Sequence, residues 1–84
     1  MDTAPTSIES AIMEIWAGVL GTSEIDLNSN FFEIGGNSLQ CLKVLNRIRA
    51  VFEIPVSLAA IFGAPTIAEQ ARVIIRAVSV SEKS

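Results

Sequence analysis

The residues best suited to chemistry in this chain lie in a nine-residue segment that places a serine where a helix begins. Residues 31–39 turn on the paired glycines Gly35 and Gly36 and then present Ser38 just as apolar side chains start to recur at helical spacing. A helix N-terminus leaves backbone N–H groups unpaired and carries partial positive charge, and both features suit an anion. The Ser38 hydroxyl is therefore well placed to carry a phosphate group.

Other kinds of active site are excluded by the residues that the chain lacks. It has no histidine and a single cysteine, Cys41, so neither a Ser-His nor a Cys-His nucleophile pair can form, and neither can an internal disulfide or a usual thiolate zinc site. Residues 26–30 resemble the start of a calcium-binding EF-hand loop, but Phe31 replaces the required glycine and Asn37 replaces the terminal glutamate. We therefore expect no metal site, and we expect Cys41 to be a buried, unreactive residue.

Composition also limits the class of protein and its partners. With 84 residues, half of them hydrophobic, the chain forms one small domain. A net charge of −3 with six basic residues argues against nucleic acid as a partner. No apolar stretch approaches the roughly 18 residues that cross a bilayer, and Asp2 and Glu9 stand where a signal peptide would carry positive charge. We expect a monomeric, cytoplasmic domain that contacts neither nucleic acid nor membrane.

Helix-period spacing and capping residues predict an all-α fold, a small four-helix bundle with three longer helices, one short helix and a long first loop. The boundary signals, in chain order, are a capping box at Thr6 and Glu9, a stop at Gly21, Pro55 followed by a Ser57 cap, and a second capping box at Thr66 and Glu69. The second helix spans about residues 38–52. The folded domain is expected at 6–78, between a flexible leader at 1–5 and a flexible tail or linker at 79–84.

The exposed face of the 38–52 helix is a second candidate site. Helical spacing turns Leu39 roughly 100° or more away from the core direction of this helix. A leucine exposed beside the candidate serine suggests a contact surface for partner proteins; the other interpretation is that it folds back against the aromatic residues of the preceding loop. Lys43 and Arg47 lie on or beside the same face, where each by itself would be an ordinary solvated charge.

Two segments of the chain resemble the landmarks of one known family. Residues 30–39 read Asn-Phe-Phe-Glu-Ile-Gly-Gly-Asn-Ser-Leu, and residues 61–68 read Ile-Phe-Gly-Ala-Pro-Thr-Ile-Ala. Together they resemble a carrier protein of the acyl/peptidyl carrier superfamily, and the similarity extends over about residues 7–78. The double glycine and the preceding Phe-Phe-Glu are closer to the peptidyl carriers of nonribosomal peptide synthetases, or of hybrid polyketide/peptide synthases, than to fatty-acid carriers. The family often has His or Asp before the serine, where this chain has Asn37.

The resemblance implies that 4′-phosphopantetheine, derived from coenzyme A, is esterified to Ser38. Gly35, Gly36 and Asn37 would form the attachment turn, and the glycines would let the modifying enzyme approach closely. The thiol of the group would carry aminoacyl, peptidyl or acyl thioesters between the enzymes of a natural-product assembly line. The chain itself would be a non-catalytic carrier and a substrate of other enzymes.

The partners that the resemblance implies are a phosphopantetheinyl transferase and synthase domains of the adenylation, condensation, ketosynthase or thioesterase type. Fatty-acid carriers present acidic residues on the helix where this chain has Lys43 and Arg47, so we expect its partners to dock mainly through apolar contacts such as Leu39. Two alternatives stay open at this point. One is a polyketide-type acyl carrier in a hybrid synthase, and the other is an unmodified helical interaction module in which Ser38 merely caps its helix.

Overall fold

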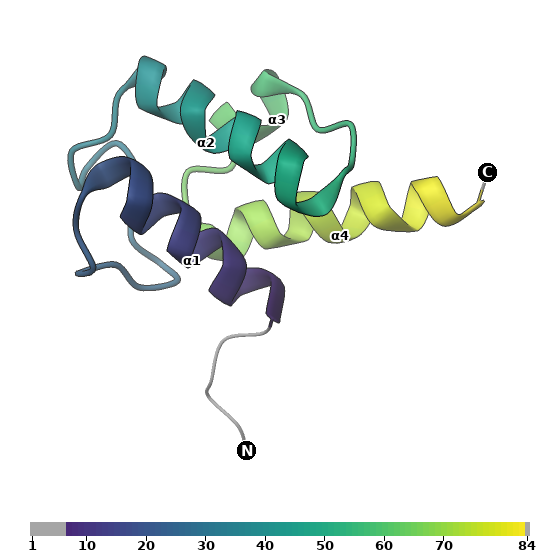
Figure 1. Ribbon diagram of the computed structural model, residues 1–84, viewed down its shortest axis with the longest axis horizontal. Helices are drawn as coiled ribbons and strands as arrows, with labels where there is room; N and C mark the ends of the chain where they lie inside the picture. Colours follow the sequence, from purple (N-terminus) through teal and green to yellow (C-terminus); the bar gives the residue numbers. More distant parts are fainter. Residues whose placement is uncertain (1–6, 84) are drawn as a thin grey trace.

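The computed structural model describes the backbone of residues 7–83 and the side chains of residues 7–78. Four helices follow one another along the chain: α1 (Ser7–Leu20), α2 (Ser38–Phe52), α3 (Leu58–Phe62) and α4 (Ile67–Lys83). Figure 1 shows α1, α2 and α4 packed together, with the short α3 between α2 and α4 in the sequence. The described residues contain no strand. The predicted bundle of three longer helices and one short helix is confirmed.

Local capping signals start and stop the helices where the sequence predicts. Gly21 follows α1 with a φ of 75°, in the left-handed region that glycine adopts without strain. The Ser57 hydroxyl oxygen accepts a hydrogen bond from the first turn of α3. At α4, the Glu69 N–H donates to Thr66 Oγ1 and the Thr66 N–H donates to Glu69 Oε1, both at 3.2 Å, which completes the predicted capping box. Thr6, from the other predicted capping box, lies outside the described residues.

The last helix crosses the predicted domain boundary at residue 78. α4 continues to Lys83 and extends away from the other helices (Figure 1). Residues 79–83 contain neither glycine nor proline, so nothing in the sequence stops the helix at 78. The use of this segment as a linker stays a prediction, and the predicted leader at 1–5 lies outside the described residues.

One apolar cluster joins all four helices. Its largest fully buried side chains are Trp16 and Ile12 of α1, Phe31 of the first loop, Val44, Leu45 and Ile48 of α2, Ile61 of α3, and Ile67 and Ile74 of α4. A buried hydrogen bond crosses this cluster, in which Trp16 Nε1 donates to Gln70 Oε1 at 3.0 Å. Because both side chains are buried, this bond satisfies polar groups that would otherwise be costly to remove from water.

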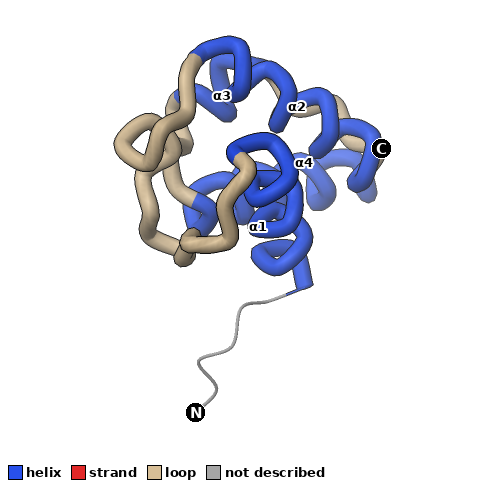
Figure 2. The backbone as a smooth tube through the Cα atoms, turned by 60° about the vertical axis from the view of Figure 1, so that its left-hand side comes forward, coloured by secondary structure: helices blue, strands red, loops and turns tan. Residues whose placement is uncertain are grey.

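Backbone hydrogen bonds hold the long first loop to the α3–α4 connection and the start of α4. The Phe31 N–H donates to the Pro65 carbonyl at 2.7 Å, and the Ala68 N–H at the start of α4 donates to the Leu27 carbonyl at 3.1 Å. Figure 2 shows this loop gathered along one side of the bundle. The two landmark segments of the sequence, 30–39 and 61–68, therefore lie against each other, and the loop is fixed as it approaches α2.

Candidate functional site

Ser38 is the first residue of α2, and its neighbour Asn37 caps the helix. Asn37 has extended backbone angles, and its side-chain Oδ1 accepts a hydrogen bond from the Gln40 N–H at 2.9 Å. The first intrahelical bond follows, from the Cys41 N–H to the Asn37 carbonyl at 2.9 Å. The interpretation of Ser38 as a simple helix cap is therefore wrong. Asn37 performs that role because its amide reaches two residues beyond Ser38.

The Ser38 hydroxyl is exposed, and no hydrogen bond to another described residue occupies it. The backbone N–H groups of Ser38 and Leu39 likewise have no acceptor among the described residues, as expected for the first positions of a helix. The first turn of α2 contains no acidic residue. A phosphodiester on Ser38 would therefore meet outward-facing N–H donors and the positive end of the helix, so the site fits this anionic group.

The turn before Ser38 requires its two glycines for different reasons. Gly35 has a φ of 110°, which L side chains rarely adopt, and nothing within 4 Å would obstruct a side chain there. Gly36 has no such angle, but a Cβ at this position would overlap the Phe31 ring and lie 2.7 Å from the Phe31 carbonyl oxygen. Further back, Asn30 Oδ1 accepts from the Phe32 N–H at 2.9 Å and so stabilises the start of the turn.

An exposed apolar surface lies on α2, α3 and the end of the first loop. Leu39 is 62% exposed, as predicted, so it projects into solvent and does not fold back onto the loop. Leu42, Phe32 and Phe62 are 40%, 38% and 37% exposed. The rings of Phe32 and Phe62 stack with centroids 5.8 Å apart. Our reading of the sequence missed Leu42, although it follows Leu39 by three residues on a helix; it also missed Phe62, which only the fold brings to the loop.

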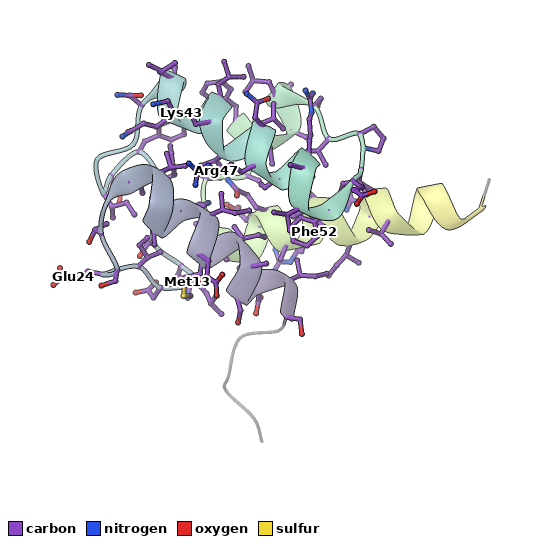
Figure 3. All side chains as sticks on the ribbon, in the orientation of Figure 1. Met13, Glu24, Lys43, Arg47 and Phe52 are labelled. Carbon is purple, nitrogen blue, oxygen red and sulfur yellow. The ribbon has the colours of Figure 1, made fainter. Side chains whose placement is uncertain are left out.

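Lys43 and Arg47 are exposed on α2, as predicted (Figure 3). Arg47 also contacts α1, because a Cβ at Gly18 would lie 3.0 Å from its Nη1 atom. Its guanidinium thus lies near the C-terminal turn of α1, where a cation interacts favourably with the helix dipole. Arg47 therefore has a structural contact in addition to any contact with a partner.

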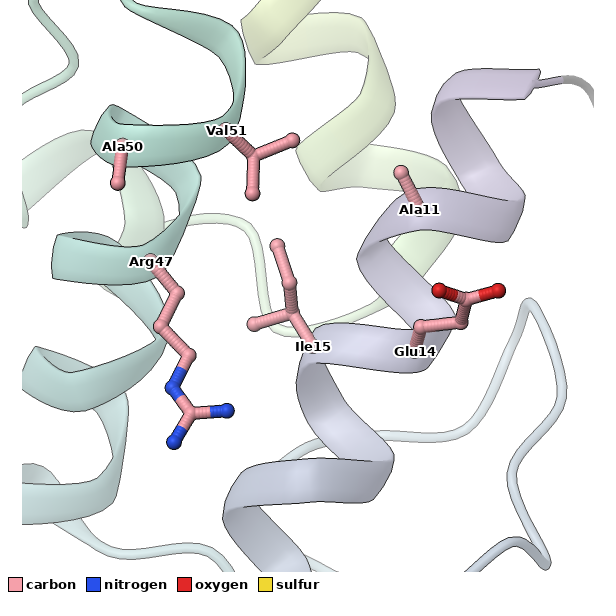
Figure 4. A pocket seen from close by; sticks show the side chains of 6 residues that line it. All are labelled: Ala11, Glu14, Ile15, Arg47, Ala50 and Val51. Carbon is pink, nitrogen blue, oxygen red and sulfur yellow. The ribbon is translucent and has the colours of Figure 1, made fainter.

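A groove between α1 and α2 lies beside Arg47 (Figure 4). Its volume is about 310 Å³, and it is lined by Ala11, Glu14, Ile15, Arg47, Ala50 and Val51. The only titratable side chains among these lining residues are Glu14 and Arg47, one from each helix.

Cys41 is buried in the core, as predicted, and burial raises the pKa of its thiol above the ordinary value of 9.0. No group of His, Cys, Asp or Glu side chains among the described residues could hold a metal ion. The segment that resembles a calcium loop instead forms a turn, in which the Asn28 N–H donates to Asp26 Oδ1 at 2.8 Å. Within residues 7–83, no helix combines the length and the apolar character that a membrane span needs.

Comparison with known proteins identifies the family. The family described as "Phosphopantetheine attachment site" matches residues 10–74 of the chain. Tyrocidine synthase 3 of Brevibacillus parabrevis is 40% identical over 68 residues, which is 81% of this chain but 1% of that protein. The chain thus spans a very small part of this much longer relative.

Solved structures give the same result for the fold. The solution structure of a prototype for the peptidyl carrier domains of modular peptide synthetases is 37% identical, with a TM-score of 0.77 over 88% of this chain and 99% of that one. The peptidyl carrier protein solved in complex with the phosphopantetheine transferase Sfp and coenzyme A is 32% identical, with a TM-score of 0.82 over 90% of this chain and 99% of that one. These similarities favour the peptidyl type over the polyketide-type alternative. The chain belongs to the phosphopantetheine attachment-site family, as a carrier domain of the peptidyl type.

Proposed function

We propose that Ser38 is the residue of this carrier domain that receives 4′-phosphopantetheine. The observation that carries the proposal is the division of roles at the start of α2, where Asn37 caps the helix and leaves the neighbouring hydroxyl exposed. A serine that the fold needs as a cap would be held by its own hydrogen bond. Here the hydroxyl is presented beside outward-facing N–H groups, which suits an attached phosphate.

The modification forms one bond and breaks another. Ser38 Oγ would attack the phosphorus of coenzyme A that bears the pantetheine, the bond from that phosphorus to adenosine 3′,5′-bisphosphate would break, and a base of the transferase would take up the hydroxyl proton. The attached group supplies a flexible arm whose thiol holds acyl groups as thioesters. The N–H groups of Ser38 and Leu39 would be available to the phosphodiester, and Gly35 supplies the positive φ that the turn before Ser38 requires.

The partners that we propose are a phosphopantetheinyl transferase and the synthase domains that load and unload the thiol, such as adenylation and condensation domains. Similar carrier proteins have been solved with a transferase and joined to an adenylation domain. Leu39 and Leu42 offer these partners an apolar contact beside Ser38, and Lys43 and Arg47 add polar contacts at its edge. Tethering keeps the cargo at high effective concentration near each enzyme in turn.

In this proposal the chain catalyses nothing: it contains no histidine, and the Ser38 hydroxyl has no base hydrogen-bonded to it among the described residues. Its role is that of a substrate presented to other active sites. A cytoplasmic location follows from the proposed chemistry, since coenzyme A and the enzymes that use it are found inside the cell.

Intact-protein mass spectrometry tests the attachment residue. The chain is incubated with coenzyme A, magnesium and a broad-specificity transferase, and we expect the mass to rise by one phosphopantetheine. Ser38→Ala should fold normally and gain no mass. Ser57→Ala, which removes the hydroxyl that caps α3, should still be modified at Ser38. A mass gain on the Ser38→Ala variant would refute the proposal, and so would an unmodified wild-type chain in a tube where a known carrier protein is modified.

A further inference from the structure

The Phe31 side chain packs against the attachment turn, residues 35–37, from the side of the core. It is only 2% exposed, and its ring meets the Trp16 ring edge-on with centroids 5.0 Å apart. The Phe32 ring also meets the Phe31 ring edge-on, with centroids 5.5 Å apart. The Phe31 backbone is held as well, since its N–H donates to Pro65 and its carbonyl accepts from the Gly36 N–H at 2.9 Å. The Phe31 ring is therefore buried between two other rings, on a backbone that is hydrogen-bonded at both its N–H and its carbonyl.

Gly36 lies directly on this ring. A Cβ at Gly36 would overlap the Cδ2 and Cε2 atoms of Phe31, whereas a Cβ at Gly35 would have nothing within 4 Å. The requirement at Gly36 is thus for space, and the requirement at Gly35 is for backbone angle. Because Gly36 immediately precedes the cap residue Asn37, the contact between ring and glycine determines where α2 begins relative to the core.

We infer that Phe31 and Gly36 are positioning residues for the modification of Ser38, which they influence through their mutual contact and not by touching the reacting atoms. This inference rests on the proposed function. A side chain at residue 36 must displace either the buried Phe31 ring or the turn that carries Asn37 and Ser38. Displacement of the turn moves the Ser38 oxygen away from the line of attack on phosphorus, and a misplacement of about 1 Å can lower a rate about 100-fold.

A displaced turn should affect kcat for phosphopantetheine transfer more than KM. The apolar surface around Leu39 and Leu42 projects from α2 itself, so a transferase can still bind a chain whose turn is displaced. We therefore expect Gly36→Ala to lower kcat for phosphopantetheine transfer by about 10-fold or more while KM changes by less than about 3-fold. A merely destabilised but folded carrier would show neither this separation of kcat from KM nor the rescue described next.

A size exchange tests the contact directly. Phe31→Leu removes the Cε2 atom that a Cβ at residue 36 would overlap and replaces the rigid ring with two δ methyl groups that can rotate away, while it keeps an apolar core residue. It therefore relieves part of the overlap with an alanine there. We expect Phe31→Leu alone to slow the transfer a few-fold, and Phe31→Leu/Gly36→Ala to recover at least about 3-fold in kcat over Gly36→Ala. Recovery should be incomplete, because the Phe31 carbonyl oxygen stays 2.7 Å from the new Cβ.

Gly35→Ala is the matched control. It is strained by its φ of 110° and not by the ring, so Phe31→Leu should not rescue it. All rates are measured at a temperature where circular dichroism shows each variant folded. If Gly36→Ala does not fold, the double variant must fold and accept phosphopantetheine; failure of both would overturn the inference. It would also be overturned by a folded Gly36→Ala with wild-type kcat, or by equal rescue of both glycine variants. An unmodified wild-type chain would instead refute the proposed function.

Discussion

At the scale of single residues, Asn37 caps α2 while its neighbour Ser38 keeps its hydroxyl exposed to solvent. Because Asn37 Oδ1 accepts the Gln40 N–H, we predict that Asn37→Ala lowers the free energy of unfolding by about 1 kcal/mol. Asn37→Asp keeps an acceptor and adds negative charge at the helix N-terminus, so it should be at least as stable as the wild type near neutral pH. Urea unfolding of the three proteins measures this order; equal stability of the Ala and Asp variants would contradict it.

Cys41 lies three residues beyond Ser38 on the same helix, but its side chain is buried where that of Ser38 is exposed. Burial raises the pKa of its thiol above 9.0, so the folded state retains a proton that the unfolded state loses at high pH. The contribution of Cys41 to stability is therefore complete below pH 9.0 and falls as the pH rises through and above that value. We predict that the urea midpoint of Cys41→Ala falls less between pH 8 and pH 10 than that of the wild type, because the variant has no thiol to ionise. The same alkaline loss in both proteins would show that Cys41 is not its source.

Alkylation of the thiol gives an independent check at the same residue. Iodoacetamide reacts with the thiolate and needs access to sulfur. We expect Cys41 in the folded chain to react at least about 10-fold more slowly at pH 8 than in urea, since it is both buried and protonated. Similar rates in the two conditions would mean that the sulfur is accessible in the native state.

At the scale of helices, α1 and α4 are joined by the buried hydrogen bond from Trp16 to Gln70. Gln70→Leu leaves the indole N–H unpaired, so we predict a loss of about 1–3 kcal/mol in the free energy of unfolding. Trp16→Phe/Gln70→Leu removes both polar groups and should be more stable than the sum of the single losses predicts. A double-mutant cycle in urea, followed by circular dichroism, measures the coupling. Additive losses would mean that the two side chains do not stabilise each other.

At the scale of the whole molecule, a single core joins four helices, and the described contacts of α4 with this core lie between Ile67 and Val78. We therefore predict that removal of residues 79–84 leaves one cooperative unfolding transition, with a change in unfolding free energy within about 0.5 kcal/mol. Phosphopantetheine transfer to Ser38 should also be retained. Trp16 fluorescence and far-ultraviolet circular dichroism should report the same midpoint. Separate midpoints would show that the end of α4 contributes to the packing of the domain.

Much of this molecule is predictable from local signals. Glycine at 21, serine at 57 and the Thr66–Glu69 capping box set helix boundaries through bonds that span only a few residues. Helical spacing is also a local signal, and it correctly placed Cys41 in the core and Leu39 on the surface. The sequence offers no stop signal at the end of α4, which continues to Lys83. The motif around Ser38 also indicated the family, because the residues of this site are contiguous in the chain and can be recognised without the fold.

The amino-acid sequence by itself thus determined the helices, the serine at the head of α2 and the family, since all three depend on neighbours in the chain. Only the tertiary structure decided how that serine is supported. The contact of Gly36 with Phe31, the stacking of Phe32 on Phe62, and the bond from Phe31 to Pro65 join residues that meet only when the loop closes on the bundle. Such contacts depend on side-chain packing in three dimensions, which periodicity along one chain does not encode.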